Sequence, residues 1–89
     1  MPQDRAADAT AQEIGRRVRR YRLATSDRAG RNMSQERLAE LAGIHRTHVG
    51  MIERGEIDTT AHNLVKIAAA LRIDPADLLS GIKPRRRRS

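Results

Sequence analysis

The residues whose chemistry stands out lie between Ser34 and Gly55, where two short apolar stripes are separated by a single glycine, Gly43. Beyond that glycine, Arg46 and Thr47 stand together at the start of the second stripe. A guanidinium group can donate two hydrogen bonds to O6 and N7 of guanine, and a threonine can contact a base edge or a thymine methyl group. These side chains therefore predict contacts to the edges of DNA base pairs.

The second stripe is predicted to form a helix from about His45 to Arg54, with Val49 and Ile52 facing inward. The side chains left on its outer face at 3.6-residue spacing include the candidate base contacts, which are Arg46, Thr47, Gly50 and Met51. An outward methionine is explained by packing on thymine methyl groups or by burial in a slightly rotated helix. A glycine inside a helix costs about 0.5–1 kcal/mol relative to alanine, which close approach to DNA or tight packing would explain.

Polar and basic side chains around this helix are candidate contacts to DNA phosphates. Two of them begin the preceding helix, where free N–H groups and the helix dipole favour an anion. Two more lie in a basic loop, which either reaches phosphates or is simply solvated. The predicted backbone contacts are Ser34, Gln35, His45, Arg54, Arg28 and Arg31. The alternative for Gln35 is an exposed residue that only favours the helix.

Catalytic and metal chemistry find little support in the sequence. His45 and His48 lie three residues apart on one helix, but no cysteine or nearby carboxylate completes a set of metal ligands. No paired carboxylates and no nucleophile beside a base stand out. We therefore predict no catalytic residue, no metal site, no cofactor and no enzymatic activity. The absence of cysteine also excludes disulfides and is compatible with a reducing compartment.

An all-α fold of five helices is predicted to position these residues. The first helix spans about Ala11 to Leu23, and Thr10 and Glu13 form a capping box at its start. Composition supports helices over a sheet, because Tyr21 is the one aromatic residue of the chain. The predicted domain spans residues 10–82, between a disordered N-terminus (1–9) and a flexible basic tail (83–89).

The other four helices are marked by caps and apolar spacing. Ser34 caps the second helix, whose buried stripe is predicted to include Leu38, Leu41 and Ala42, and Gly43 ends it. The fourth helix follows Thr60 and carries apolar residues at i, i+3, i+4 and i+7. The fifth begins around the residues Asp74, Pro75 and Asp77, which combine a cap, a proline and an acid.

Positive charge is concentrated in two parts of a chain whose net charge is +7. Residues 14–31 hold seven arginines and one acid, and the tail ends in four consecutive arginines followed by a serine. Such a distribution favours a polyanion, with nucleic acid first, although it also suits a solvated face. No apolar run approaches the roughly 20 residues that cross a bilayer. We therefore expect a cytoplasmic protein, associated with the nucleoid through DNA and without a membrane partner.

Several motifs together resemble the phage repressor and Cro family, often called the XRE family. They include Ile14-Gly15-x-x-Val18-Arg19-x-x-Arg22, Ser34-Gln35-x-x-Leu38-Ala39 and Ile52-Glu53-Arg54-Gly55. The resemblance implies a repressor-like bundle whose second and third helices form a helix-turn-helix on double-stranded DNA. It also implies a structural salt bridge between Arg22 and Glu53. Arg37 departs from the pattern, since the family usually has glutamate there.

The resemblance implies a transcription regulator that binds a short pseudo-palindromic operator, as a homodimer with half-sites roughly 34 Å apart. The chain resembles restriction-modification controllers in its Arg46-Thr47 start, and an antitoxin or a stand-alone repressor is equally compatible in length. A toxin or RNA polymerase is then a possible partner. The fifth helix, with Leu78, Leu79 and Ile82, is the predicted dimer surface. The alternative function is a protein-interaction adaptor or coactivator with the same fold.

Overall fold

The computed structural model describes residues 9–26 and 29–83 of the 89-residue chain. Within this part of the chain there are five helices and no named strand, which confirms the predicted all-α fold. The helices are α1 (Ala9–Leu23), α2 (Gln35–Ala42), α3 (Arg46–Glu53), α4 (Ala61–Leu71) and α5 (Ala76–Leu79). Residues 1–8 of the predicted disordered segment, residues 84–89 of the predicted tail and Arg28 lie outside the described residues. Ala9, predicted to be disordered, is instead part of α1.

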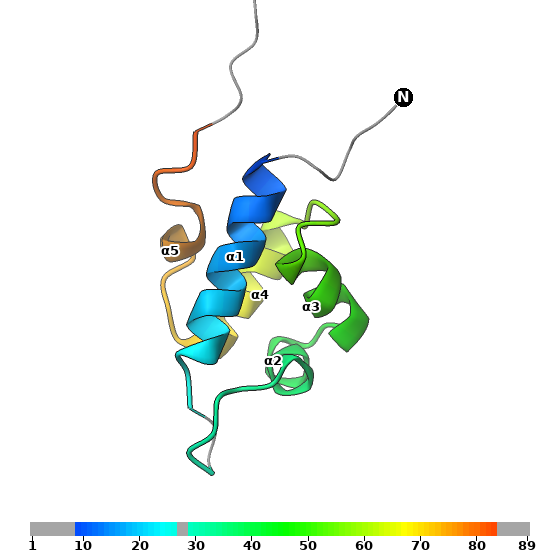
Figure 1. The fold of residues 1–89 in the computed structure, drawn as a ribbon, viewed down its shortest axis with the longest axis vertical. Coiled ribbons are helices and arrows are strands. Elements are labelled where there is room, and N and C mark those ends of the chain that lie inside the picture. The colour runs from blue at the N-terminus through cyan, green and yellow to red at the C-terminus, as the bar shows by residue number, and fades with distance from the viewer. Residues whose placement is uncertain (1–8, 27–28, 84–89) are drawn as a thin grey trace, which may run out of the picture.

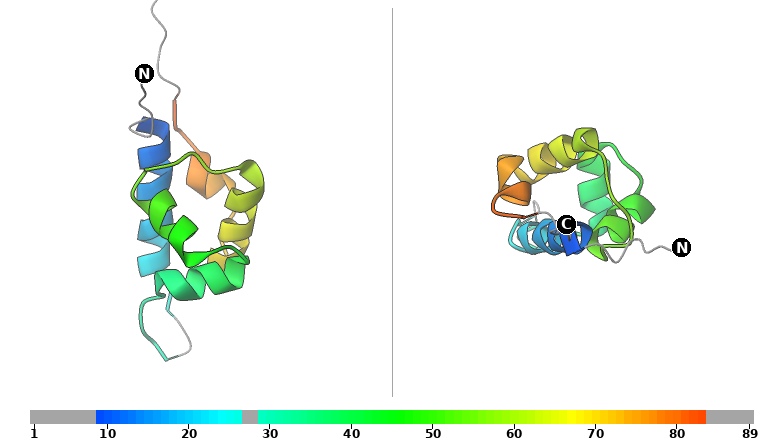
Figure 2. Two further views of the ribbon diagram at one scale, coloured as in Figure 1. Left: turned by 90° about the vertical axis from the view of Figure 1, so that its right-hand side faces the viewer. Right: turned by 90° about the horizontal axis from the view of Figure 1, so that it is seen from above.

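The long first helix organises the bundle. α1 packs against α3, α4 and α5, while α2 packs against both α3 and α4. Figure 2 shows α2 running across the lower ends of α1 and α4, with α3 in front of them. Figure 1 shows that α1 begins and the described chain ends at the opposite end of the molecule from α2. The pair α2 and α3 therefore forms one face of the bundle.

Each helix contributes to one apolar core. The largest fully buried side chains are Val18, Leu38, Val49, Ile52, Ile67 and Leu78, so all five helices supply at least one. The prediction that Leu41 belongs to the buried stripe of α2 is wrong, because its side chain is 45% exposed. The packed face of α2 instead passes through Ala39 and Ala42, whose small side chains let neighbouring helices approach and leave Leu41 facing outward.

Local hydrogen bonds define the ends of α2 and α4 as predicted. The Ser34 hydroxyl accepts from the Arg37 N–H at 3.0 Å, and Gly43 ends α2 with a left-handed φ of 73°. The Thr60 hydroxyl likewise accepts from the Asn63 N–H at 3.0 Å. Each cap satisfies an N–H group that has no partner within its own helix.

The start of α5 agrees with the prediction, whereas the start of α1 does not. The Asp74 carboxylate accepts from the Ala76 N–H, as its position as a cap predicts. The capping box predicted between Thr10 and Glu13 is wrong, because α1 is already helical at Ala9 and contains Thr10. The Glu13 carboxylate turns to the arginines three and four residues later, which offer stronger charged donors than a backbone N–H group.

α1 and α3 approach closely enough to exclude a side chain at Gly15. A Cβ atom built there would lie 2.2 Å from the Ile52 carbonyl oxygen and 2.8 Å from the Glu53 carbonyl oxygen. Only glycine permits this separation, since both neighbours are backbone atoms that cannot move independently. The close approach fixes the end of α3 against α1. No helix among the described residues is long and apolar enough to cross a membrane.

Candidate nucleic-acid interface

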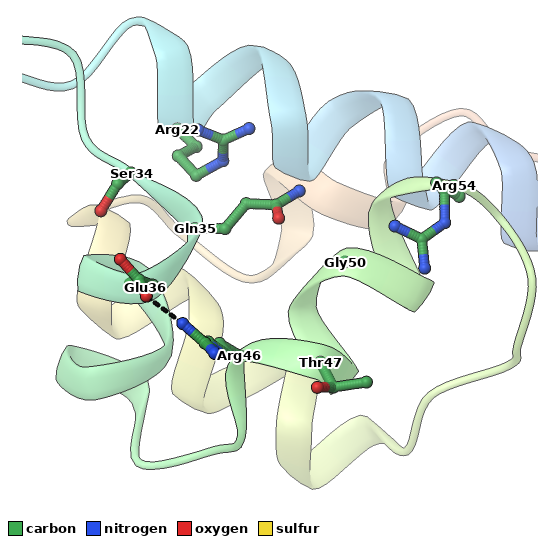
Figure 3. A pocket seen from close by; sticks show the side chains of 8 residues that line it. All are labelled: Arg22, Ser34, Gln35, Glu36, Arg46, Thr47, Gly50 and Arg54. Atoms are coloured by element: carbon green, nitrogen blue, oxygen red, sulfur yellow. Dashed lines mark hydrogen bonds and ion pairs between the residues drawn. The ribbon is translucent and has the colours of Figure 1, made fainter.

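An open hollow lies between the start of α2 and the length of α3. Its lining combines arginines with small and polar residues, namely Arg22, Ser34, Gln35, Glu36, Arg46, Thr47, Gly50 and Arg54 (Figure 3). Seven of these eight residues come from the segment 34–54 that the sequence singles out. The hollow therefore brings together most of the residues predicted to contact DNA.

Two of the four predicted base contacts, Arg46 and Thr47, are exposed on this surface. Arg46 begins α3 and Thr47 follows it, and both side chains point outward at the rim of the hollow. The Arg46 side chain is 65% exposed, and its Nη1 donates to the Glu36 carboxylate, which is 66% exposed (Figure 3). Both can therefore reach a surface that approaches α3.

The other two predicted base contacts, Gly50 and Met51, are less exposed than Arg46 and Thr47. Gly50 is buried at the back of the hollow, where a Cβ would lie 3.1 Å from Arg54 Nη1 and 3.6 Å from Gln35 Oε1. Met51 is half-buried. The prediction that Gly50 lies on the outer face is wrong, because α3 packs on α1 and α2 along a face that includes Gly50 and Glu53. Met51 keeps part of its side chain exposed, so its base contact stays a prediction.

A buried polar network joins three helices behind the hollow. Arg22 Nε and Nη2 donate to the two carboxylate oxygens of Glu53 at 2.6 and 2.9 Å, and both residues are at most 8% exposed. The third nitrogen, Arg22 Nη1, donates to the Met33 carbonyl oxygen at 2.8 Å. Gln35 Nε2 donates to Glu53 Oε1 at 2.9 Å. These additional hydrogen bonds to the Met33 carbonyl and from Gln35 offset the cost of removing the charges of Arg22 and Glu53 from water.

Gln35 therefore has a role that the sequence did not predict. Its amide nitrogen ties α2 to Glu53 of α3, while its Oε1 lies toward Gly50 and the hollow. The predicted phosphate contact through its backbone N–H, at the first residue of α2, stays compatible with this geometry. The two roles use different atoms of the same residue.

His45 and Ser34 both cap helices that face the hollow. The His45 ring accepts from the Thr47 N–H through Nδ1 at 3.0 Å, so the imidazole serves as the N-cap of α3. The Ser34 hydroxyl oxygen accepts from a backbone N–H, while its hydrogen can still be donated. Both predicted phosphate contacts therefore lie at helix starts, where partial positive charge gathers.

Arg54 lies at the other end of α3 and meets a second glutamate that the sequence did not single out. Its Nε donates to Glu56 at 2.7 Å, and this bond lowers the pKa of Glu56 and raises the pKa of Arg54. Arg31 is exposed in the connection between α1 and α2. That connection is closed by a bridge between Ser26 and Asn32.

The two histidines that suggested a metal are not arranged as ligands of one ion. The His45 ring caps α3, whereas His48 Nε2 lies 3.3 Å from the Asn63 side-chain amide. Among residues 9–26 and 29–83, no group of three or more histidine, cysteine or acidic residues is placed to hold a metal.

Comparison with known proteins decides the family to which this arrangement belongs. Residues 26–78 match the helix-turn-helix family HTH_3, and this span includes α2, α3 and α4 with every residue of the hollow except Arg22. The chain belongs to the helix-turn-helix family. Members of this XRE-type family are DNA-binding transcription regulators, so the function predicted from the sequence is confirmed at this level.

Several relatives are control proteins of similar size. The chain is 45% identical over 66 residues to control protein C.BamHI of Bacillus amyloliquefaciens, covering 74% of this chain and 75% of that protein. It is 45% identical over 49 residues to control protein C.SmaI of Serratia marcescens, covering 55% and 58%. The restriction-modification controller protein C.AhdI of Aeromonas hydrophila has the same fold, with a TM-score of 0.69, 40% identity and coverage of 79% and 97%.

Proposed function

We propose that this helix-turn-helix protein is a restriction-modification controller that binds a short pseudo-palindromic operator as a homodimer. The observation that carries the proposal is the exposure of Arg46 and Thr47 on the first turn of α3, across the hollow from the start of α2. In helix-turn-helix proteins, the first residues of the second helix contact base edges and the first helix crosses the backbone. The exposed end of α3 fits this division.

Base contacts are proposed for Arg46 and Thr47. The arginine donates to a guanine, and the threonine contacts a neighbouring base edge or methyl group. Gly50 contributes by the absence of a side chain, which leaves the back of the hollow open to an approaching DNA strand. The exposed part of Met51 supplies an apolar contact to a thymine methyl group.

Backbone contacts are proposed for the residues around the rim. The Ser34 hydroxyl and the Gln35 N–H face a phosphate at the start of α2, where the helix dipole favours an anion. His45, Arg54 and Arg31 add donors on either side. Phosphate contacts of this kind fix the register of the protein on the duplex and leave the choice of sequence to the base contacts.

A homodimer is proposed because one recognition helix contacts too few base pairs for a unique site. Two domains related by two-fold symmetry would place their α3 helices about 34 Å apart, one turn of the duplex. The exposed large apolar side chains of the described residues all lie outside the hollow, and they are Leu23 (38%), Leu41 (45%), Val65 (52%) and Leu79 (45%). Leu79 supports the predicted surface on α5, and Ile82 is half-buried. The prediction is wrong for Leu78, which is fully buried because it anchors α5 in the core.

The relatives favour a controller over the antitoxin, stand-alone repressor and adaptor interpretations. C.AhdI is a restriction-modification controller, and C.BamHI and C.SmaI are control proteins. Arg46 and Thr47 both line the open hollow, where a base edge can reach them. We therefore propose regulation of gene expression through an operator, with double-stranded DNA as the partner.

The test is selection of bound duplexes from a random pool, for the wild type and for Arg46→Ala, at two salt concentrations. The wild type is expected to enrich a two-fold symmetric site. Arg46→Ala should lose the preference for guanine at one symmetric position, at a cost of about 1–3 kcal/mol. Binding that fades with salt without enriching any sequence would contradict the proposal and favour a non-specific binder or an adaptor.

A further inference from the structure

We propose that Glu36 is a specificity-determining residue, which positions Arg46 for a guanine edge and keeps backbone phosphates away from it. The inference deepens the proposed function and rests on it, because it concerns how the same surface distinguishes an operator from other DNA. Glu36 lies on α2 and Arg46 lies on α3, so the tertiary fold brings them together.

The contact between the two side chains is direct. Glu36 Oε2 accepts from Arg46 Nη1, although the residues stand ten positions apart in the chain. Figure 3 shows the pair at the mouth of the hollow, near Thr47 and below Ser34. Both side chains are about two-thirds exposed, so the pair stands in the surface that DNA would cover.

The bond leaves the recognition edge of the guanidinium usable. Arginine carries five N–H donors in a planar fork, and Glu36 engages Nη1. The edge formed by Nε and Nη2 can still donate two parallel hydrogen bonds to O6 and N7 of a guanine. The bond to Glu36 restricts the Arg46 side chain before DNA binds. Arg46 therefore loses less conformational entropy when it contacts a base, and this favours that contact.

The negative charge of Glu36 acts differently on a phosphate. A phosphate that reaches Arg46 must come close to the Glu36 carboxylate, and two like charges at that distance repel one another. A guanine edge carries no net charge and meets no such penalty. The carboxylate therefore weakens the use of Arg46 as a general phosphate contact more than its use as a base contact, and a built-in repulsion of this kind raises specificity.

A second glutamate of the same helix provides a matched control. Glu40 is 70% exposed, pairs with Arg37 at 2.6 Å and does not line the hollow. Glu36→Gln and Glu40→Gln change the charge of α2 equally, so any general effect of net charge on DNA binding is common to both. A difference between the two variants reports the position of Glu36 beside Arg46.

The test measures Kd for the selected operator and for a random-sequence duplex at several salt concentrations. Glu36→Gln should tighten binding to the random duplex by up to about fivefold, the most that an exposed charge pair is usually worth, without tightening operator binding equally. The ratio of the two affinities should then fall, and in the Arg46→Ala background the same change should leave the ratio unaltered. Glu40→Gln should shift both affinities together.

The outcomes separate this inference from the proposed function. If the ratio of operator to random affinity changes equally in Glu36→Gln and Glu40→Gln while the wild type still selects an operator, the role of Glu36 is overturned. The proposed function is then unaffected. A wild type without a preferred sequence overturns the proposed function as well. A DNA-free measurement adds a second criterion, because NMR should show the Arg46 guanidinium rotating more freely in Glu36→Ala, and unchanged rotation would contradict the positioning role.

Discussion

Two glycines lie inside helices, Gly15 in α1 and Gly50 in α3, and they differ in what surrounds them. Gly15 of α1 faces backbone carbonyl oxygens of α3, the nearest at 2.2 Å from an added Cβ. Gly50 of α3 faces the flexible end of Arg54 at 3.1 Å. A rigid neighbour must be displaced by a methyl group, whereas a flexible side chain can move aside at little cost.

We therefore predict that Gly15→Ala destabilises the fold and Gly50→Ala does not. The first change forces α1 and α3 apart and disturbs the pair of Arg22 with Glu53, at a cost of at least about 2 kcal/mol. The second gains helix propensity worth about 0.5–1 kcal/mol. Chemical denaturation of both variants measures the difference, and equal stabilities would show that close approach does not limit the packing of α1 on α3.

The sequence predicted individual contacts of the site to different extents. The pair of Arg22 with Glu53 follows from the family pattern, and the exposure of Arg46 and Thr47 follows from helical spacing. The pairing of Arg46 with Glu36 could not be predicted, because it depends on how two helices cross. Periodicity defines the faces of a helix, but the rotation of that helix against its neighbours comes from packing.

At the scale of elements, α5 depends on α1 for its position. It has four residues, too few for an isolated helix to be stable. Leu78 anchors it in the core, and Arg17 of α1 donates to the Ser80 carbonyl oxygen at 2.7 Å. The Glu13 carboxylate holds Arg17 through Nε at 2.9 Å. An acidic side chain of α1 thus orients the arginine that completes the end of α5.

This arrangement predicts a pH-dependent contribution of Glu13 to stability. Hydrogen bonds from Arg17 and Arg16 lower the pKa of Glu13 from its usual value near 4.5. A carboxyl group with a lowered pKa stabilises the folded state above its unfolded pKa, and this contribution is lost as the pH falls through the folded pKa. Glu13→Gln should therefore lower the melting temperature at neutral pH and converge with the wild type in acid.

The measurement is thermal unfolding from pH 7 down to pH values well below 4.5, combined with NMR of the Leu78 methyl groups. Glu56→Gln is the control, since the pKa of Glu56 is also lowered but its partner Arg54 follows the end of α3, away from α5. Only Glu13→Gln should alter the surroundings of Leu78. An unchanged methyl spectrum at neutral pH would show that α5 is held by burial alone.

The ends of α2 and α4 were predicted more accurately than the packed face of α2 or the start of α1, for a physical reason. The caps at Ser34, Gly43 and Thr60 depend on hydrogen bonds within a few residues, so local sequence determines them. Leu41 was misplaced because small neighbouring alanines, and not the largest apolar side chain, determine where other helices can approach. Thr10 was misplaced because α1 is already helical at Ala9, and the Glu13 carboxylate accepts from Arg16 and Arg17 instead of a backbone N–H group.

At the scale of the whole molecule, the positive charge is less available to DNA than the composition indicates. The segment 14–31 holds seven arginines, but Arg16 and Arg17 pair with Glu13, and Arg22 pairs with Glu53. Around the hollow, Arg46 and Arg54 also contact carboxylates. Intramolecular pairs therefore offset much of the charge of the folded bundle, and this favours contacts that depend on geometry over general attraction.

The four arginines of the segment 84–89 are then predicted to supply much of the general affinity for DNA. Each arginine that neutralises a phosphate releases counterions and adds about 0.9 to the slope of log K against log salt concentration. Replacing Arg85–Arg88 with serine should reduce that slope and weaken binding to the operator and to random duplexes by similar factors. The selected sequence should not change, because the base contacts lie on α3.

Salt titrations of the wild type and the serine variant, each with the operator and with a random duplex, measure both quantities. Arg46→Ala provides the complementary control, since it should lower the affinity ratio while changing the slope little. If the serine variant instead loses its operator preference, these arginines contact bases or a groove of defined width. Sequence discrimination would then not be confined to the α2–α3 face, where geometry holds Arg46 beside Glu36.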